Sequence, residues 1–125
     1  MVFIADDNLA DVDLIQLAFF ENNLNVDFTV ATDGLQAIEL LLTVLPTLIL
    51  LDIKMPGADG FEVLSHLRSQ PRLQDVHVIV MSSSNARVDH DRALKLGASQ
   101  YWTKPARFDE TVRLIGTLRQ LVNGT

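Results

Sequence analysis

Short runs of apolar residues alternate with longer amphipathic segments along most of this chain. Each run has the length of a strand buried on both faces. The five predicted strands are Val2–Ala5, Val26–Ala31, Leu48–Leu51, Val76–Met81 and Gln100–Thr103. The five predicted helices are Ala10–Glu21, Gly34–Leu42, Phe61–Ser69, Val88–Leu96 and Asp109–Val122. This alternation predicts an α/β fold, in which helices cover both faces of a parallel sheet.

The length of the chain, 125 residues, favours the five-stranded order 2-1-3-4-5 over the six-stranded order known for such sheets. Residues 1–125 are expected to form a single domain with one sizeable core. Asp33 and Asp59 each precede a predicted helix, where a carboxylate accepts hydrogen bonds from free backbone N–H groups. The last predicted helix carries an apolar stripe at helical spacing, formed by Val112, Ile115, Leu118 and Val122.

Composition narrows the function classes. The net charge of −6 disfavours direct nucleic-acid binding, which needs clustered cations, and disfavours an anionic membrane surface. The chain has no cysteine, which excludes disulfides and thiolate metal sites.

Leu40–Leu51 is uncharged, but it is too short for a membrane span and contains Pro46, so we expect a helix end, a turn and a strand. The amino terminus lacks a basic flank before its apolar residues, and we expect a cytoplasmic protein without a signal peptide.

Acidic residues follow two of the predicted strands. Asp6 and Asp7 follow the first strand, and Asp52 follows the third. In the order 2-1-3-4-5 these strands are neighbours, and ligands gather at their carboxyl ends where the strand order reverses. Carboxylates brought this close repel one another unless a cation lies between them. Hard oxygen ligands with room for water suit Mg²⁺, so we expect a magnesium site here.

A hydroxyl and an ammonium follow the last two predicted strands. Ser82 follows the fourth strand and Lys104 follows the fifth, so both are expected at the same edge as Asp52. Such groups stabilise the oxygens of a transferred phosphoryl group. Asp52, at the end of a rigid strand, is therefore expected to act as a nucleophile. The backbone carbonyl of Lys54, in the loop that follows, is expected to add a metal ligand.

Four stretches together resemble the receiver domain of two-component response regulators, and the resemblance covers essentially the whole chain. They are "IADDN", "LILLDIKMPGADGFEVL", "VIVMSSS" and "GASQYWTKP". The opening "DDNLADVDLIQLAF" resembles the single-domain receivers associated with bacteriophytochrome kinases. The implied architecture is the flavodoxin-like receiver fold, with five helices on the two faces of the sheet.

The resemblance implies a phosphorylation switch rather than a turnover enzyme. A sensor histidine kinase or phosphotransfer protein would phosphorylate Asp52, with Mg²⁺ held by Asp7 directly and by Asp6 largely through water. Ser82 matches the switch hydroxyl, Lys104 the phosphate contact and Tyr101 the aromatic residue that changes rotamer. The Lys104–Pro105 bond is usually cis in this family. A downstream protein partner is expected at the fourth helix, fifth strand and fifth helix, about Val88 to Val122.

Three other functions remain open at this point. An aspartyl-phosphate hydrolase would use a second acid two residues after its nucleophile, where Lys54 stands. A flavodoxin-like cofactor carrier would bind phosphate at the loop that holds Asp6 and Asp7, whose charges repel it. A phosphorylation-independent interaction module would need none of the acids.

The adjacent Phe19 and Phe20 cannot both face the sheet, so one is expected at the surface, where it could form a homodimer contact.

Overall fold

The five predicted strands are present in the computed structural model, which describes residues 1–123. The strands are β1 Val2–Ala5, β2 Phe28–Ala31, β3 Leu48–Leu51, β4 His77–Ser82 and β5 Gln100–Thr103. The helices are α1 Leu9–Glu21, α2 Gly34–Leu40, α3 Gly60–Arg68, the short 3-10 helix η1 Pro71–Leu73, α4 Arg87–Lys95, α5 Phe108–Gly116 and α6 Arg119–Asn123. Three strands have the predicted bounds, whereas β2 begins two residues later and β4 is displaced by one residue.

All five strands are parallel and lie in the order β2-β1-β3-β4-β5, as predicted. The crossover between β1 and β3 places these two strands side by side, with Ala5 opposite Leu51. The backbone N–H of Asp52 donates to the carbonyl of Ala5 at 2.9 Å, so the pairing continues one residue past β3. The residues that follow β1 and β3 therefore emerge together at one edge of the sheet.

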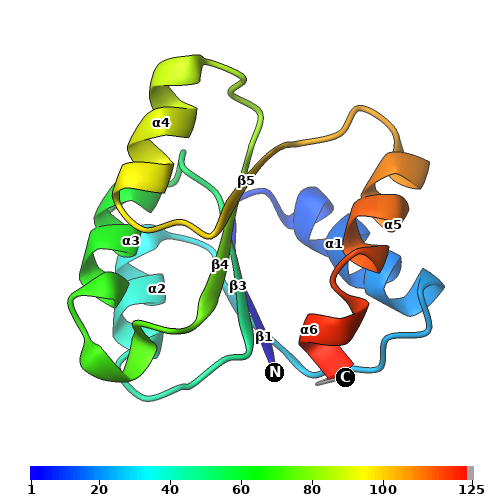
Figure 1. Ribbon diagram of the computed structural model, residues 1–125, viewed down its shortest axis with the longest axis horizontal. Coiled ribbons are helices and arrows are strands. Elements are labelled where there is room, and N and C mark those ends of the chain that lie inside the picture. The colour runs from blue at the N-terminus through cyan, green and yellow to red at the C-terminus, as the bar shows by residue number, and fades with distance from the viewer. Residues whose placement is uncertain (124–125) are drawn as a thin grey trace.

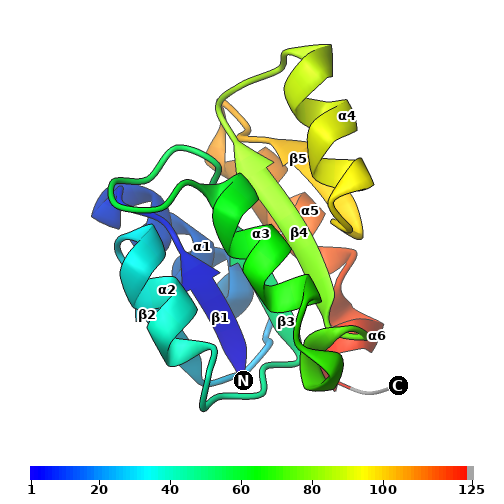
Figure 2. The ribbon, with the colours of Figure 1, turned by 90° about the vertical axis from the view of Figure 1, so that its left-hand side faces the viewer.

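Helices cover both faces of the sheet (Figure 1). Helices α2, α3 and α4 lie on one face, and α1, α5 and α6 lie on the other. The view in Figure 2 shows α2, α3 and α4 in front of the strands. The long alternating pattern of the sequence thus produces two apolar layers, one on each side of a sheet whose central strands β1, β3 and β4 are almost entirely buried. The edge strands β2 and β5 are partly exposed.

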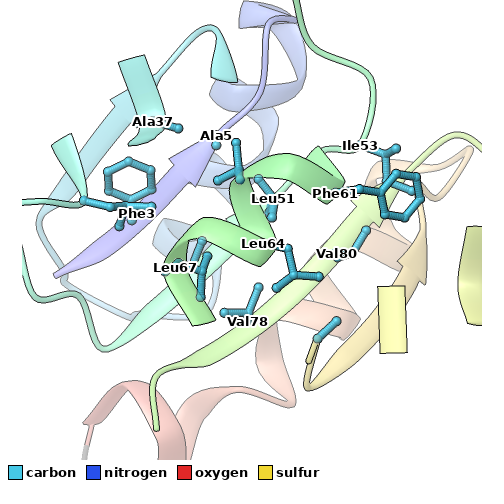
Figure 3. Close-up of a cluster of buried hydrophobic side chains, with 14 of the residues drawn as sticks. Phe3, Ala5, Ala37, Leu51, Ile53, Phe61, Leu64, Leu67, Val78 and Val80 are labelled. Carbon is cyan, nitrogen blue, oxygen red and sulfur yellow. The ribbon is translucent and has the colours of Figure 1, made fainter. Parts of the chain in front are cut away.

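Each layer has its own cluster of buried side chains. Under α2, α3 and α4, side chains of the sheet such as Phe3, Leu51 and Val80 pack against Leu64 and Leu67 of α3 (Figure 3). On the other side, Ile4 of β1, Leu50 of β3 and Ile79 of β4 belong to a second cluster. In this cluster the strands pack against Phe19 of α1 and Ile115 of α5. The adjacent Tyr101 and Trp102 pack against opposite clusters, as expected for neighbours on a strand.

Both predicted carboxylate caps are present. Asp33 Oδ1 accepts the N–H of Gln36 at 2.7 Å, and Asp59 Oδ1 accepts that of Glu62 at 2.9 Å. The segment from Leu40 to Leu51 is a helix end, a turn and a strand, and no helix among residues 1–123 is long and apolar enough to cross a membrane.

The prediction of one continuous helix over Asp109–Val122 is wrong. Helix α5 ends at Gly116, and α6 begins at Arg119. Gly116 lies against the end of α1, where an added Cβ would meet Asn22 Oδ1 at 2.8 Å. Glycine and the following Thr117 both lower helix propensity, so the chain turns here. The predicted apolar stripe nevertheless packs in one cluster, the one beneath α1 and α5, where Ile115 and Leu118 are buried.

The pair of adjacent phenylalanines near the end of α1 divides as expected. Phe19 is fully buried and stacks edge-to-face on Phe28 with ring centroids 5.3 Å apart. Phe20 is 75% exposed. The expectation that one ring of the pair lies at the surface is therefore confirmed.

Candidate functional site

Three carboxylates meet at the carboxyl edge of the sheet, as predicted. Asp6 and Asp7 follow β1 and Asp52 follows β3, and these strands are neighbours. One oxygen from each carboxylate lies within 4.8 Å of those of the other two. Asp6 is 3% exposed and Asp52 is 7% exposed, whereas Asp7 faces solvent. The site therefore combines two buried acids with one that is open to an approaching ion.

The ammonium of Lys104 lies among these acids. The backbone N–H of Lys104 donates to the carbonyl of Ser82 at 2.7 Å, which carries the β4–β5 pairing past the end of β5. Its Nζ lies 2.9 Å from Asp6 Oδ2 and 3.2 Å from Asp52 Oδ2. Lys104 and the acids therefore lie at the same edge of the sheet, as the sequence predicted.

A fourth carboxylate, which the sequence analysis did not single out, completes the surroundings of Lys104. Asp11 Oδ2 accepts a hydrogen bond from Lys104 Nζ at 2.7 Å. Asp11 lies in the first turn of α1, whose amino terminus is capped by the side chain of Asn8. Its spacing in the sequence could have indicated that Asp11 lies near the site. Asp11 comes four residues after Asp7, about one helical turn, and the helix that contains it begins at the site.

Burial and charge change the ionisation of this site. Burial raises the pKa of Asp6 to about 6, against the opposing effects of the Asn8 N–H and of Lys104. Burial alone would lower the pKa of Lys104, but its hydrogen bonds to Asp11 and Asp6 and the charge of Asp52 raise it. Lys104 is therefore a permanent cation, and ionised Asp6 is held in a site that disfavours its charge.

The chemistry of the donors fits a hard divalent cation. Asp6, Asp7, Asp11 and Asp52 bring four carboxylates to this edge, and Lys104 supplies one positive charge in contact with Asp6, Asp11 and Asp52. Clustered carboxylate oxygens with one solvent-exposed member suit an ion that keeps several waters, such as Mg²⁺. The residues therefore fit the expected metal, with Asp6, Asp7 and Asp52 as the carboxylates that would hold it.

The loop after β3 is held tightly at both of its ends. The backbone N–H of Lys54 donates to Asp52 Oδ1 at 3.3 Å, and the N–H of Gly60 donates to the carbonyl of Ile53 at 2.7 Å. A Cβ on Gly60 would lie 2.2 Å from the carbonyl oxygen of Asp52, so only glycine allows α3 to start this close to β3. Lys54 is thus brought beside the acids, although its carbonyl as a metal ligand stays a prediction.

Ser82 and Tyr101 are connected to each other through the loop after β4. Ser82 is fully buried, and its hydroxyl accepts the N–H of Ser84 at 3.2 Å. The Tyr101 hydroxyl donates to the carbonyl of Ser84 at 2.7 Å, and its ring stacks edge-to-face with His90. Within residues 1–123, no hydrogen bond joins either side chain to Asp52.

One expectation about the backbone at this edge is wrong. No peptide bond among the described residues is cis, so the Lys104–Pro105 bond is trans. The trans form is the lower in energy for an X–Pro bond, by about 0.5–1 kcal/mol.

The chain is similar to known proteins over nearly its whole length. The family model of the response regulator receiver domain matches residues 2–116. The response regulator PleD of Caulobacter vibrioides is 32% identical over 120 residues, which are 96% of this chain but only 25% of PleD. The chain thus spans about a quarter of that relative's length.

Two solved structures share the fold closely. The phosphorylated cyanobacterial phytochrome response regulator RcpA is 29% identical with a TM-score of 0.88, over 98% of this chain and 92% of RcpA. The Mn²⁺-bound form of response regulator Rcp1 is 25% identical with a TM-score of 0.85, over 95% of this chain and 91% of Rcp1.

Proposed function

This chain belongs to the response regulator receiver domain family, whose members accept phosphoryl groups in two-component signalling, and we propose that it is a Mg²⁺-dependent switch phosphorylated on Asp52. The observation that carries the proposal is the environment of Asp52. Its buried carboxylate ends a central strand, has two further acids within 4.8 Å and contacts Lys104 at 3.2 Å. A nucleophile, a metal site and a fixed cation therefore share one edge of the sheet.

Phosphoryl transfer at this edge needs positioning and charge stabilisation more than covalent chemistry from the protein. An oxygen of Asp52 forms a bond to phosphorus while the N–P bond of the donor phosphohistidine breaks, and the imidazole leaves with that electron pair. Lys104 stabilises the phosphoryl oxygens. Mg²⁺ held by Asp6, Asp7 and Asp52, with the Lys54 carbonyl as a further ligand, would neutralise the remaining charge.

Phosphorylation is expected to shift the population between two arrangements of the loop after β4. The phosphoryl oxygens offer the O–H of the buried Ser82 a charged acceptor, and a shift of the hydroxyl toward it would also move the oxygen that accepts the N–H of Ser84. Because Tyr101 is bound to the carbonyl of Ser84, movement of this loop also releases Tyr101. The surface of α4, β5 and α5 would then change, and we propose that the downstream partner binds there.

The donor is proposed to be a sensor histidine kinase or a phosphotransfer protein in the cytoplasm. A turnover phosphatase is disfavoured because Lys54 stands where a second acid would be needed as general acid. Direct nucleic-acid binding is disfavoured by the net charge of −6. A homodimer stays a prediction, for which the exposed Phe20 is the first residue to substitute.

Labelling with a small-molecule phosphodonor tests the proposal. The protein is incubated with acetyl phosphate and MgCl₂, and the intact mass is measured. We expect one phosphoryl group on the wild type and none on the Asp52→Asn variant. Asp13→Asn is the matched control, because Asp13 is an exposed acid on α1. Equal labelling of Asp52→Asn and wild type would rule out Asp52 as the acceptor, and labelling that is unaffected by EDTA would rule out the metal requirement.

A further inference from the structure

The ammonium of Lys104 contacts three different carboxylates. Nζ lies 2.7 Å from Asp11, 2.9 Å from Asp6 and 3.2 Å from Asp52, so Asp11 makes the shortest contact. Asp11 is the only one of the three acceptors that comes from a helix, and it is not among the three acids clustered for a metal. The position of Lys104 therefore depends on a residue outside the proposed phosphoryl site.

We infer that Asp11 is a positioning residue that holds the Lys104 ammonium beside Asp52 for phosphoryl transfer. The inference rests on the proposed function. When a metal ion and a phosphoryl group occupy the oxygens of Asp6 and Asp52, these two carboxylates become weaker partners for Lys104. The bond to Asp11 stays available, because Asp11 binds neither group. Asp11 thus fixes the lysine in the state in which its charge is needed.

The surroundings show that Lys104 has room to move if this bond is lost. A cavity of about 40 Å³ lies between α1, the end of β4 and the start of α5. Asp11, Met81, Lys104, Pro105 and Thr111 are among the residues that line it. A space of this size admits about one water molecule. Without Asp11, the flexible lysine chain can therefore turn toward this space, with water replacing the lost carboxylate.

Two substitutions at Asp11 separate positioning from simple charge. Asp11→Asn removes the negative charge but keeps an oxygen that accepts a hydrogen bond from Lys104, whereas Asp11→Ala removes both. If Asp11 acted only by repelling the anionic donor, both variants would be phosphorylated faster, and to the same degree. Positioning predicts that Asp11→Ala is slow and that Asp11→Asn recovers much of the wild-type rate. Asp13→Asn, on the same helix but exposed, controls for the change in net charge.

The first experiment measures the rate of Asp52 labelling by acetyl phosphate at saturating MgCl₂. We expect Asp11→Ala to slow labelling on the order of tenfold, the size of coupling found for residues in one ion-pair network. In a Lys104→Met background, Asp11→Ala should have no further effect, because its action passes through the lysine. An Asp11→Ala rate equal to or above wild type overturns the inference, as does an undiminished loss in the Lys104→Met background.

The second experiment reads the lysine directly and needs no phosphodonor. Nitrogen-15 NMR detects an ammonium only when its protons exchange slowly with water, as expected for Lys104 bound to three carboxylates. With MgCl₂ present, this signal should persist in wild type and Asp11→Asn and disappear in Asp11→Ala, while the backbone amide spectrum stays folded. An unchanged signal in Asp11→Ala overturns the inference. Absence of labelling in wild type would overturn the proposed function alone, because this signal does not depend on phosphorylation.

Discussion

Replacing Asp6 by asparagine is expected to stabilise the metal-free protein at neutral pH. Asp6 is 3% exposed, and burial raises its pKa from 3.8 to about 6 although the Asn8 N–H and Lys104 act in the other direction. A shift of about two pKa units corresponds to about 3 kcal/mol between the two protonation states. Because the folded state holds the Asp6 proton more tightly than the unfolded state, the free energy of unfolding falls as pH rises from about 4 to about 6.

In the Asp6→Asn variant, the free energy of unfolding should not decrease in this way between pH ~4 and pH ~6. The asparagine side chain is uncharged at every pH and keeps an oxygen that can accept the N–H of Asn8, which bonds Asp6 Oδ1 at 2.9 Å in the wild type. At pH ~3, below both pKa values, the two proteins should be equally stable, because Asp6 is then largely protonated in both states of the wild type. Above about pH 6 the variant should be more stable, by up to about 3 kcal/mol.

Urea unfolding in EDTA, followed by the fluorescence of Trp102, measures this difference. Trp102 is the sole tryptophan and packs against the cluster under α1 and α5, so its emission reports on the core. The Asp13→Asn control removes an exposed charge and should change stability by no more than about 0.5 kcal/mol. Adding MgCl₂ should narrow the gap, because an ion that binds the folded wild type stabilises it by mass action.

Two results would refute the reasoning. One is an Asp6→Asn variant that is less stable than wild type at neutral pH in EDTA, which would mean that the ion pair with Lys104 outweighs the effect of burial. The other is a stability difference of the same size at pH ~3 and above pH ~6, since ionisation of Asp6 could then not be its cause.

Three further substitutions test the loop geometry around the site. Gly60→Ala places a Cβ 2.2 Å from the Asp52 carbonyl oxygen, so urea unfolding should show a loss of about 2 kcal/mol or more, and acetyl phosphate should label Asp52 more slowly. Asp59→Ala removes the cap of α3 and should lower the unfolding free energy by about 1 kcal/mol in the same assay. Tyr101→Phe removes the donor to the Ser84 carbonyl; amide hydrogen exchange of the loop after β4 should accelerate, and unchanged exchange would show that this bond does not hold the loop.

The parts of the site that follow from chain order were predictable from the sequence. Asp6 and Asp52 come directly after apolar runs, and parallel pairing brings the ends of those runs together whatever the helices do. Lys104 is placed by the same rule at the end of β5. These predictions needed only the strand order and the rule that ligands gather at the carboxyl edge.

The parts that depend on the rotation of helices and the path of loops were not predictable. Asp11 reaches Lys104 because α1 packs with one particular face on the sheet, and its apolar pattern leaves that angle only loosely defined: Leu14 and Leu17 are exposed, whereas Ile15 is buried. The break at Gly116 follows from its close approach to α1, a contact between segments far apart in the chain. In such cases the deciding neighbour lies outside the local sequence.

The link between Ser82 and Tyr101 passes through the main chain of a single residue. Ser84 offers its N–H to the one and its carbonyl to the other, and neither bond uses the Ser84 side chain. The Ser84 hydroxyl serves a different contact: it donates to Asp89 Oδ2 at 2.6 Å and accepts the N–H of Ala86 at 3.3 Å, so its replacement would weaken the attachment of the loop to α4 while both main-chain bonds stay possible. Proline, which has no N–H, is the substitution that would sever the main-chain link. The main-chain contacts and the side-chain contacts of this one residue can therefore be changed by different substitutions.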